Sequence, residues 1–106
     1  MTVRYKNAKT YLTTTDATAV LTPANATTAI IKSILVSEDS GNADTITLTI
    51  TAGSDVFSLF KVKAVSANGT VELLSAPLVL AESEILKATA ATANRLHIVV
   101  SYMEIS

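Results

Sequence analysis

The clearest pattern in the chain is a regular alternation of apolar and polar residues between Ala43 and Thr51. Ile46, Leu48 and Ile50 fall on one side of an extended strand, with threonines at the positions around them. Successive side chains of a strand point to opposite faces, so this period of two predicts a half-buried β-strand. Threonine suits the solvent-facing side because it is both β-branched and polar. We expect the rest of the chain to pair with this strand.

Further strands are predicted on both sides of this segment, separated by turns rich in Gly, Pro, Asn and Ser. They cover residues 18–22, 29–37, 56–65, 71–74, 78–80 and 95–104. Residues 29–37 carry apolar side chains at odd and even positions, which predicts a central strand covered on both faces. Residues 81–95 fit a helix, because Ala, Glu and Lys are good helix formers, or a strand over residues 85–90 followed by a turn at residues 92–94.

Two features concern the middle of the chain. Within residues 56–65, Val56, Phe60 and Val62 are expected on one face of the strand, and Phe57 and Leu59 on the other. The sequence after this strand, Ala-Asn-Gly-Thr at residues 67–70, is expected to form a type I′ turn, because Asn-Gly fits its two positive-φ positions.

Seven or eight short strands with short connections predict an all-β fold, an antiparallel β-sandwich, of which the jelly roll is one form. The length of 106 residues suits one domain. Residues 1–12 are expected to form an N-terminal arm or a first strand, and residues 13–106 a single β-sandwich domain.

The composition points to a surface that other proteins cover. Charged residues make up 16 % of the chain, against about 25 % in soluble domains. The net charge of −1 gives no basic surface, so nucleic acid is not an expected partner. The chain has no cysteine and therefore no disulfide framework and no thiolate metal site. It has no apolar run near the ~20 residues that cross a membrane and no apolar signal-peptide core near Met1, so synthesis in a cytosol and no membrane contact are expected.

Residues that could carry chemistry are few. His97, the only histidine, lies inside a predicted strand without a Gly-x-Ser-x-Gly motif, which favours a sheet-face residue and no enzymatic activity. Glu38, Asp39 and Asp44 have the composition of a calcium loop, but Gly41 is out of place and no closing Glu follows. A solvated turn is the expectation there, with no catalytic residue, metal or cofactor.

Apolar strands joined by small polar turns recur at residues 29–36, 44–48, 77–80, 85–88 and 99–105. Over roughly residues 26–106, this pattern resembles small β-sandwich virion structural proteins of tailed bacteriophages, which decorate or cement capsids or belong to the neck and tail. Glu-Ser-Glu at residues 82–84 stands where such families usually show a Gly-Asp pair. Their function lies in surfaces, so the resemblance implies no individual site residues.

The resemblance implies a virion structural protein, first a capsid decoration or cement subunit and alternatively a neck, tail or fibre component. The expected partners are the major capsid protein or other virion proteins, with a homo-oligomer such as a trimer, and the expected location is the virion. A carbohydrate- or surface-binding module is the alternative from another class, although the chain has no Trp.

Arg4, Tyr5 and Tyr11 are the expected interface residues. A tyrosine ring buries area at an interface while its hydroxyl finds a polar partner. If residues 1–12 form an arm, their removal is expected to abolish attachment without unfolding the protein.

Overall fold

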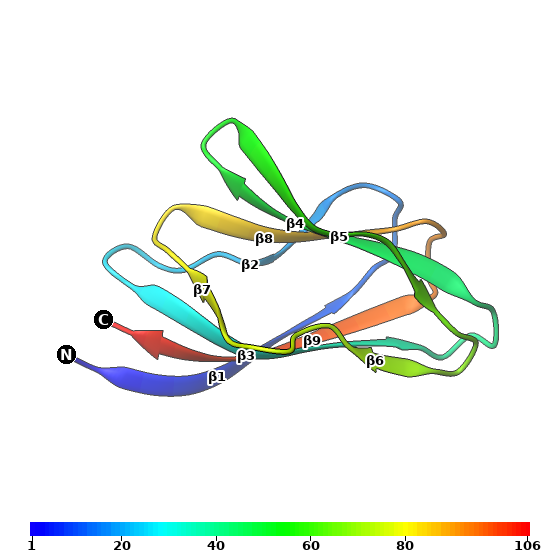
Figure 1. Ribbon diagram of the computed structural model, residues 1–106, viewed down its shortest axis with the longest axis horizontal. Coiled ribbons are helices and arrows are strands. Elements are labelled where there is room, and N and C mark those ends of the chain that lie inside the picture. Colours follow the sequence, from blue (N-terminus) through cyan, green and yellow to red (C-terminus); the bar gives the residue numbers. More distant parts are fainter.

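The computed structural model describes all residues from 1 to 106 and contains nine β-strands and no helix (Figure 1). The strands are β1 (Val3–Tyr11), β2 (Thr18–Leu21), β3 (Thr28–Glu38), β4 (Asp44–Ala52), β5 (Asp55–Val65), β6 (Thr70–Glu72), β7 (Leu78–Leu80), β8 (Glu84–Ala90) and β9 (Leu96–Ile105).

The strands form two antiparallel sheets that pack face to face as a β-sandwich. One sheet has the order β1-β9-β3-β6, with β7 also paired to β3, and the other has the order β2-β8-β4-β5. Figure 1 shows them as two layers, with β1, β9, β3 and β6 below β2, β8, β4 and β5. The predicted antiparallel sandwich is confirmed, with nine strands instead of seven or eight.

The pairing pattern is that of a jelly roll. β1 pairs with β9, β2 with β8, β3 with both β6 and β7, and β4 with β5. The chain is therefore one long hairpin, closed by the turn between β4 and β5 and folded over into two sheets. β6 and β7 occupy successive stretches of the same edge of β3, and residues 73–77 between them interrupt what would otherwise be one strand.

The hydrophobic core lies between the two sheets and takes one face of each central strand. In β4, Ile46, Leu48 and Ile50 are buried, whereas the threonines between them are half-exposed, as the alternation predicts. β9 follows the same rule, with Leu96 and Val100 among its fully buried residues. Each buried aliphatic side chain of this size contributes about 1.5–3 kcal/mol relative to an exposed one.

β3 is central in its sheet, but only one of its faces is buried. Its pairing with β9 shifts by one residue between Ile31 and Ser33, so Lys32 forms a β-bulge. Ile31 and Ile34 consequently both point into the core, although they are three residues apart. Leu35, on the other face, is 40 % exposed. The prediction that both faces are covered is wrong. Apolar residues stand at odd and even positions because the bulge changes which positions of β3 point into the core.

Residues 1–12 are an integral part of the sandwich. β1 pairs with β9 along its whole length, from Val3 opposite Ile105 to Tyr11 opposite His97. The residue that follows β1, Leu12, is fully buried in the core. Residues 1–12 thus contain a first strand and do not form an arm, so their removal is now expected to leave β9 unpaired on one side and to open the core.

The two alternatives for residues 81–95 are now decided in favour of a strand. β8 covers Glu84–Ala90 and lies between β2 and β4. A turn follows, in which Asn94 has a φ of 65°, and the chain then enters β9. The helix-forming composition is overridden because Leu86, Ala88 and Ala90 alternate onto the core side of the sheet, where all three are buried.

β5 departs from simple alternation. Its pairing with β4 slips twice, on either side of Leu48. Because each slip inserts a residue, the neighbours Leu59 and Phe60 are both half-buried against the core instead of facing opposite sides. The faces predicted for residues 56–65 are therefore wrong.

The turn after β5 also differs from the expected type I′. The N–H of Gly69 donates to the carbonyl of Ser66 at 2.9 Å, which closes a four-residue turn. Asn68 has a φ of 56°, whereas Gly69 is not in the left-handed region. Only one positive φ is needed here, and asparagine tolerates it better than most residues.

Candidate interaction surfaces

Four side chains form a continuous row across the outer face of the sheet that contains β1, β9, β3 and β7. Tyr5 lies opposite Met103, Met103 opposite Ile30, and Ile30 opposite Val79. Residues directly opposite each other on antiparallel strands share a face, with their Cβ atoms about 4.5–5.5 Å apart. Tyr5 is 81 % exposed and Val79 58 %, whereas Met103 and Ile30 are half-buried. We call these four residues the apolar row.

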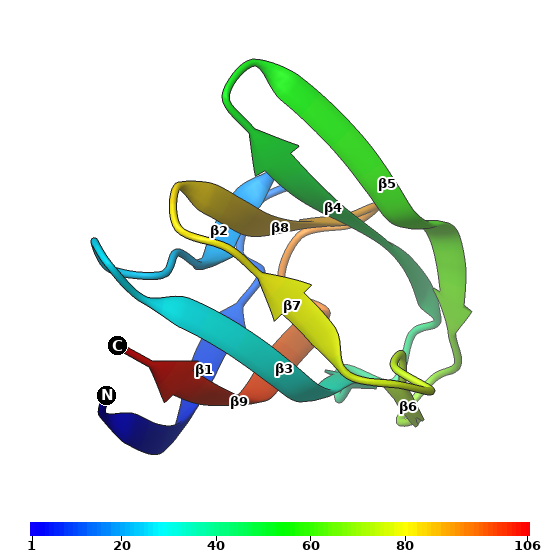
Figure 2. The same cartoon turned by 60° about the vertical axis from the view of Figure 1, so that its left-hand side comes forward.

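The apolar row faces away from the core. Ala29 and Ile31, on either side of Ile30 in β3, are buried, and successive side chains of a strand alternate between faces. Val3 and Ile105 form the neighbouring pair toward the chain ends and extend the apolar surface. Figure 2 shows the two chain ends beside each other, at the start of β1 and the end of β9. On the other side the surface becomes polar, at Asn7, Ser101 and Ser33.

An apolar band that crosses several strands and has a polar border is typical of a docking surface. Single exposed apolar residues are normal, but their alignment through three strand pairings is a feature of the sheet as a whole. The alternation within β3 and β9 could have indicated apolar residues on the outer faces. Their alignment into one row depends on register, which the sequence alone did not reveal.

The structure does not bring the three expected interface residues together. Tyr5 belongs to the apolar row. Arg4 precedes it and therefore lies on the opposite face of β1, opposite Glu104. Tyr11 shares the outer face with Tyr5 but is six residues away, which corresponds to about 20 Å along a strand.

Tyr11 belongs to a polar corner at the far end of β1. Its hydroxyl donates to the backbone carbonyl of Asn94 at 3.0 Å, and its ring meets the ring of His97 edge-on at a centroid distance of 4.4 Å. The Nδ1 atom of His97 lies 3.8 Å from the Asp39 carboxylate. His97 is thus a half-exposed residue of the sheet face, and its contacts with Tyr11 and Asp39 are consistent with a structural role.

A second exposed apolar surface lies on β5, an edge strand of the other sheet. Val56, Phe57 and Val62 are each more than half exposed, at 63 %, 56 % and 60 %. Lys61 and Lys63 are exposed on the same strand. Figure 1 shows the β4–β5 hairpin projecting from the upper layer. The slipped pairing of β5 scatters these side chains, so they do not form an aligned row.

The acidic residues considered for a calcium loop are engaged elsewhere. Glu38 is only 1 % exposed, and its carboxylate accepts hydrogen bonds from the backbone N–H groups of Ser40, Gly41, Asn42 and Asn68 and from the Ser40 hydroxyl. Asp44 is 7 % exposed and accepts the N–H of Thr92 at 3.1 Å. The prediction of a solvated turn is wrong for these two carboxylates.

The environment of Glu38 keeps its carboxylate ionised. Burial by itself raises the pKa of this group, but the hydrogen bonds from the Ser40 hydroxyl and from the backbone of Asn68, Ser40 and Asn42 outweigh it and lower the pKa from 4.5 to about 2. A charged acceptor is suited to this position, because it receives N–H groups of both the β3–β4 loop and the turn after β5.

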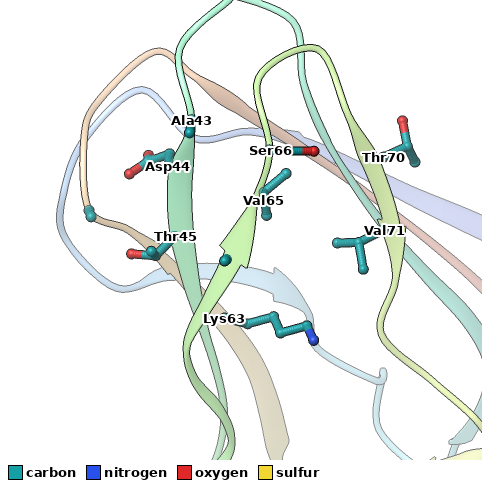
Figure 3. Close-up of a pocket in the computed structure, with 10 residues that line it drawn as sticks. Ala43, Asp44, Thr45, Lys63, Val65, Ser66, Thr70 and Val71 are labelled. Atoms are coloured by element: carbon teal, nitrogen blue, oxygen red, sulfur yellow. The ribbon is translucent and has the colours of Figure 1, made fainter.

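A cavity of about 660 Å³ opens between the ends of β4, β5 and β6 (Figure 3). Figure 3 shows Val65 on β5 and Val71 on β6, which are edge strands of different sheets, with Lys63 near the lower edge of the opening. Asp44 is the only acidic residue in the lining, and its carboxylate already holds Thr92. The lining contains neither Tyr nor Trp, the residues that a carbohydrate site would favour.

A scan against protein-family models and searches of curated proteins and of solved structures found no match for this chain. No helix of the protein is long and apolar enough to cross a membrane. No group of three or more His, Asp or Glu side chains is arranged to hold a metal ion.

Proposed function

We propose that this protein is a bacteriophage virion structural protein, a decoration or cement subunit that docks on the major capsid lattice. The observation that carries the proposal is the apolar row on the outer face of the β1-β9-β3-β7 sheet. The resemblance to phage virion proteins is the reason for proposing a virion as the assembly. The low proportion of charged residues, 16 %, is consistent with a surface covered by protein.

The proposed mechanism is interfacial. The sandwich is a preformed body, so docking its flat outer face costs little conformational entropy. Tyr5 and Val79 are the most exposed members of the row and stand on its two outermost strands, β1 and β7. Their burial against the capsid would remove the largest apolar area from water, and Tyr is often among the few residues that dominate an interface.

A cyclic homo-oligomer, such as a trimer, would present several copies of the apolar row to a symmetric position of the capsid. A neck, tail or fibre position would use the same surface on a different partner. Imaging of particles separates these locations, because a decoration subunit repeats over the whole lattice whereas a neck or tail subunit is confined to one vertex.

The test is an add-back experiment with particles assembled without this chain. Purified protein is added, particles are sedimented, and the bound protein is measured as a function of concentration. The double variant Tyr5→Ser/Val79→Ser is expected to bind at least about ten-fold more weakly than the unmodified protein. The matched control is Phe57→Ser/Val56→Ser, which removes two similarly exposed residues from β5 and is expected to bind normally.

Thermal unfolding of both variants establishes that each is folded. Failure of the unmodified protein to bind any particle would overturn the proposed function. If the two double variants lose particle binding equally, the protein still docks on the particle, but the apolar row is not the surface responsible.

A further inference from the structure

Four strand edges border the two sheets, and three of them are poorly suited to pairing with another strand. β5 is slipped twice and carries Val62 at a φ of 55°. β2 has four residues and a shifted register, and Pro23 follows it closely. β6 and β7 have three residues each, with Pro77 directly before β7. Bulges, short strands and prolines are the usual protection of sheet edges.

The fourth edge, β1, has none of these features. It is nine residues long, contains no proline, and keeps an unbroken register with β9. It lies at the end of its sheet, so no strand pairs with its other side. An unprotected edge of this length is a template for a further strand.

The hydrogen bonds between β1 and β9 show which backbone groups are free. Thr2 and Ser106 exchange both of their backbone hydrogen bonds, at 2.8 and 2.9 Å, and Leu12 donates to Leu96 at 2.9 Å. In an antiparallel pair, such hydrogen-bonded residues alternate with residues whose N–H and C=O groups point away from the partner. The even-numbered residues of β1 therefore bond to β9. The outward-pointing groups belong to Val3, Tyr5, Asn7, Lys9 and Tyr11, all of which are exposed.

The side chains of β1 define the chemistry of a complementary strand. Arg4, Lys6 and Lys9 give β1 three positive charges and no negative one. Lys6 forms an ion pair with Glu104 at 3.3 Å, whereas Arg4 and Lys9 form no ion pair within the protein. Tyr5 and Val3 present apolar groups on the outer face.

We infer that the free edge of β1 binds an extended acidic segment of a partner protein, which adds as a further strand to the sheet. Apolar residues of this segment would lie beside Tyr5 and continue the apolar row, and acidic residues would lie beside Arg4. A second copy of this chain fits less well, because pairing β1 with β1 brings together two strands that carry only positive charges. The inference rests on the proposed docking function for its biological setting, and it specifies how the partner is held.

Hydrogen exchange measured residue by residue tests this inference. In the protein alone, the even-numbered amides of β1 should exchange slowly and the odd-numbered amides quickly. A synthetic nine-residue peptide of alternating Glu and Val, the length of β1, serves as the probe. It should slow exchange at Tyr5, Asn7 and Lys9 roughly ten-fold or more. A peptide of alternating Lys and Val is the control and should have no effect.

The variant Asn7→Pro removes one outward-pointing N–H without removing a bond to β9, a position at which an edge strand tolerates proline. It should abolish the slowing of exchange by the Glu-Val peptide, whereas Asn7→Ala, which keeps the N–H, should retain it. Slow exchange of the even-numbered amides in both variants shows that β1 remains paired with β9.

Unchanged exchange at the odd-numbered amides under saturating Glu-Val peptide would overturn the inference, as would equal protection by the Lys-Val peptide. The particle assay gives an independent result. Normal particle binding by Asn7→Pro would remove strand addition but leave the proposed function. If the unmodified protein binds no particle but the Glu-Val peptide still adds to β1, the proposed function fails and strand addition stands.

Discussion

The backbone N–H of Val62 donates a hydrogen bond of 3.1 Å to the side-chain hydroxyl of Thr47, where a regular ladder would offer a backbone carbonyl. The two residues lie at the slip between β4 and β5. Val62 adopts a φ of 55°, a left-handed conformation that is unfavourable for a β-branched residue. The side chain of Thr47 thus helps to hold a strained position of the neighbouring strand.

Replacing Val62 with glycine should stabilise the protein. Glycine adopts positive φ freely, so the variant removes strain of about 1–3 kcal/mol against an entropic cost of about 0.5–1 kcal/mol. Val56→Gly is the matched control, because Val56 lies on the same strand with 63 % exposure, against 60 % for Val62. It should lose about 0.5–1 kcal/mol. Urea unfolding measures both, and equal destabilisation would show that Val62 is unstrained.

Stability should fall in acid through Glu38. The pKa of this carboxyl is about 2 in the folded protein, against an ordinary value of 4.5, so the unfolded chain takes up the proton first. Its contribution is fully present above pH 4.5 and is lost as the pH falls toward 2. The melting temperature of the unmodified protein should therefore drop more steeply over this range than that of Glu38→Gln. Parallel curves for the two proteins would contradict this role.

Glu72 should matter for the bulge in β3. Its carboxylate accepts the N–H of Ile34 at 2.8 Å, the N–H of Leu74 at 3.2 Å and the hydroxyl of Ser33. Burial raises its pKa, but these hydrogen bonds outweigh burial and lower it. Glu72→Ala leaves these donors unpaired and should cost about 1–2 kcal/mol in chemical unfolding.

The comparison for Glu72 is Glu104→Ala, which removes only the partly exposed ion pair with Lys6 and should cost less than about 1 kcal/mol. If the two variants are equally stable, Glu72 does not support the bulge.

The alternation in β4 predicts opposite outcomes for adjacent positions. Leu48 is fully buried, so Leu48→Ala should destabilise the protein by about 2–5 kcal/mol through lost burial and a residual cavity. Thr49 is half-exposed on the other face, and Thr49→Ala should cost less than about 1 kcal/mol. Denaturant unfolding measures both. A small effect at Leu48 would contradict the assignment of the core face.

Much of this fold can be predicted from local sequence patterns. The burial of alternate residues around Leu48 was predicted because a strand exposes its two faces in turn, whatever its neighbours are. The hairpin at Gly53, with a φ of 63°, and the strand-rich fold class follow from equally local chemistry. The expectation that Tyr5 belongs to an interface had a different basis, the amphipathic chemistry of its side chain.

Other features were decided only by the packed sheets. The bulge at Lys32 and the slips in β5 change the phase of a strand, and they arise from pairing with partners that are distant in the sequence. The burial of Glu38 depends on Asn68, thirty residues away, which donates to its carboxylate. Local patterns therefore predicted most of the strands and the inner face of β4, whereas register between distant strands determined the faces in β3 and β5, the apolar row and the free edge of β1. The physical reason is that a side chain's face depends on its own strand, but its neighbours depend on which other strands fold against it.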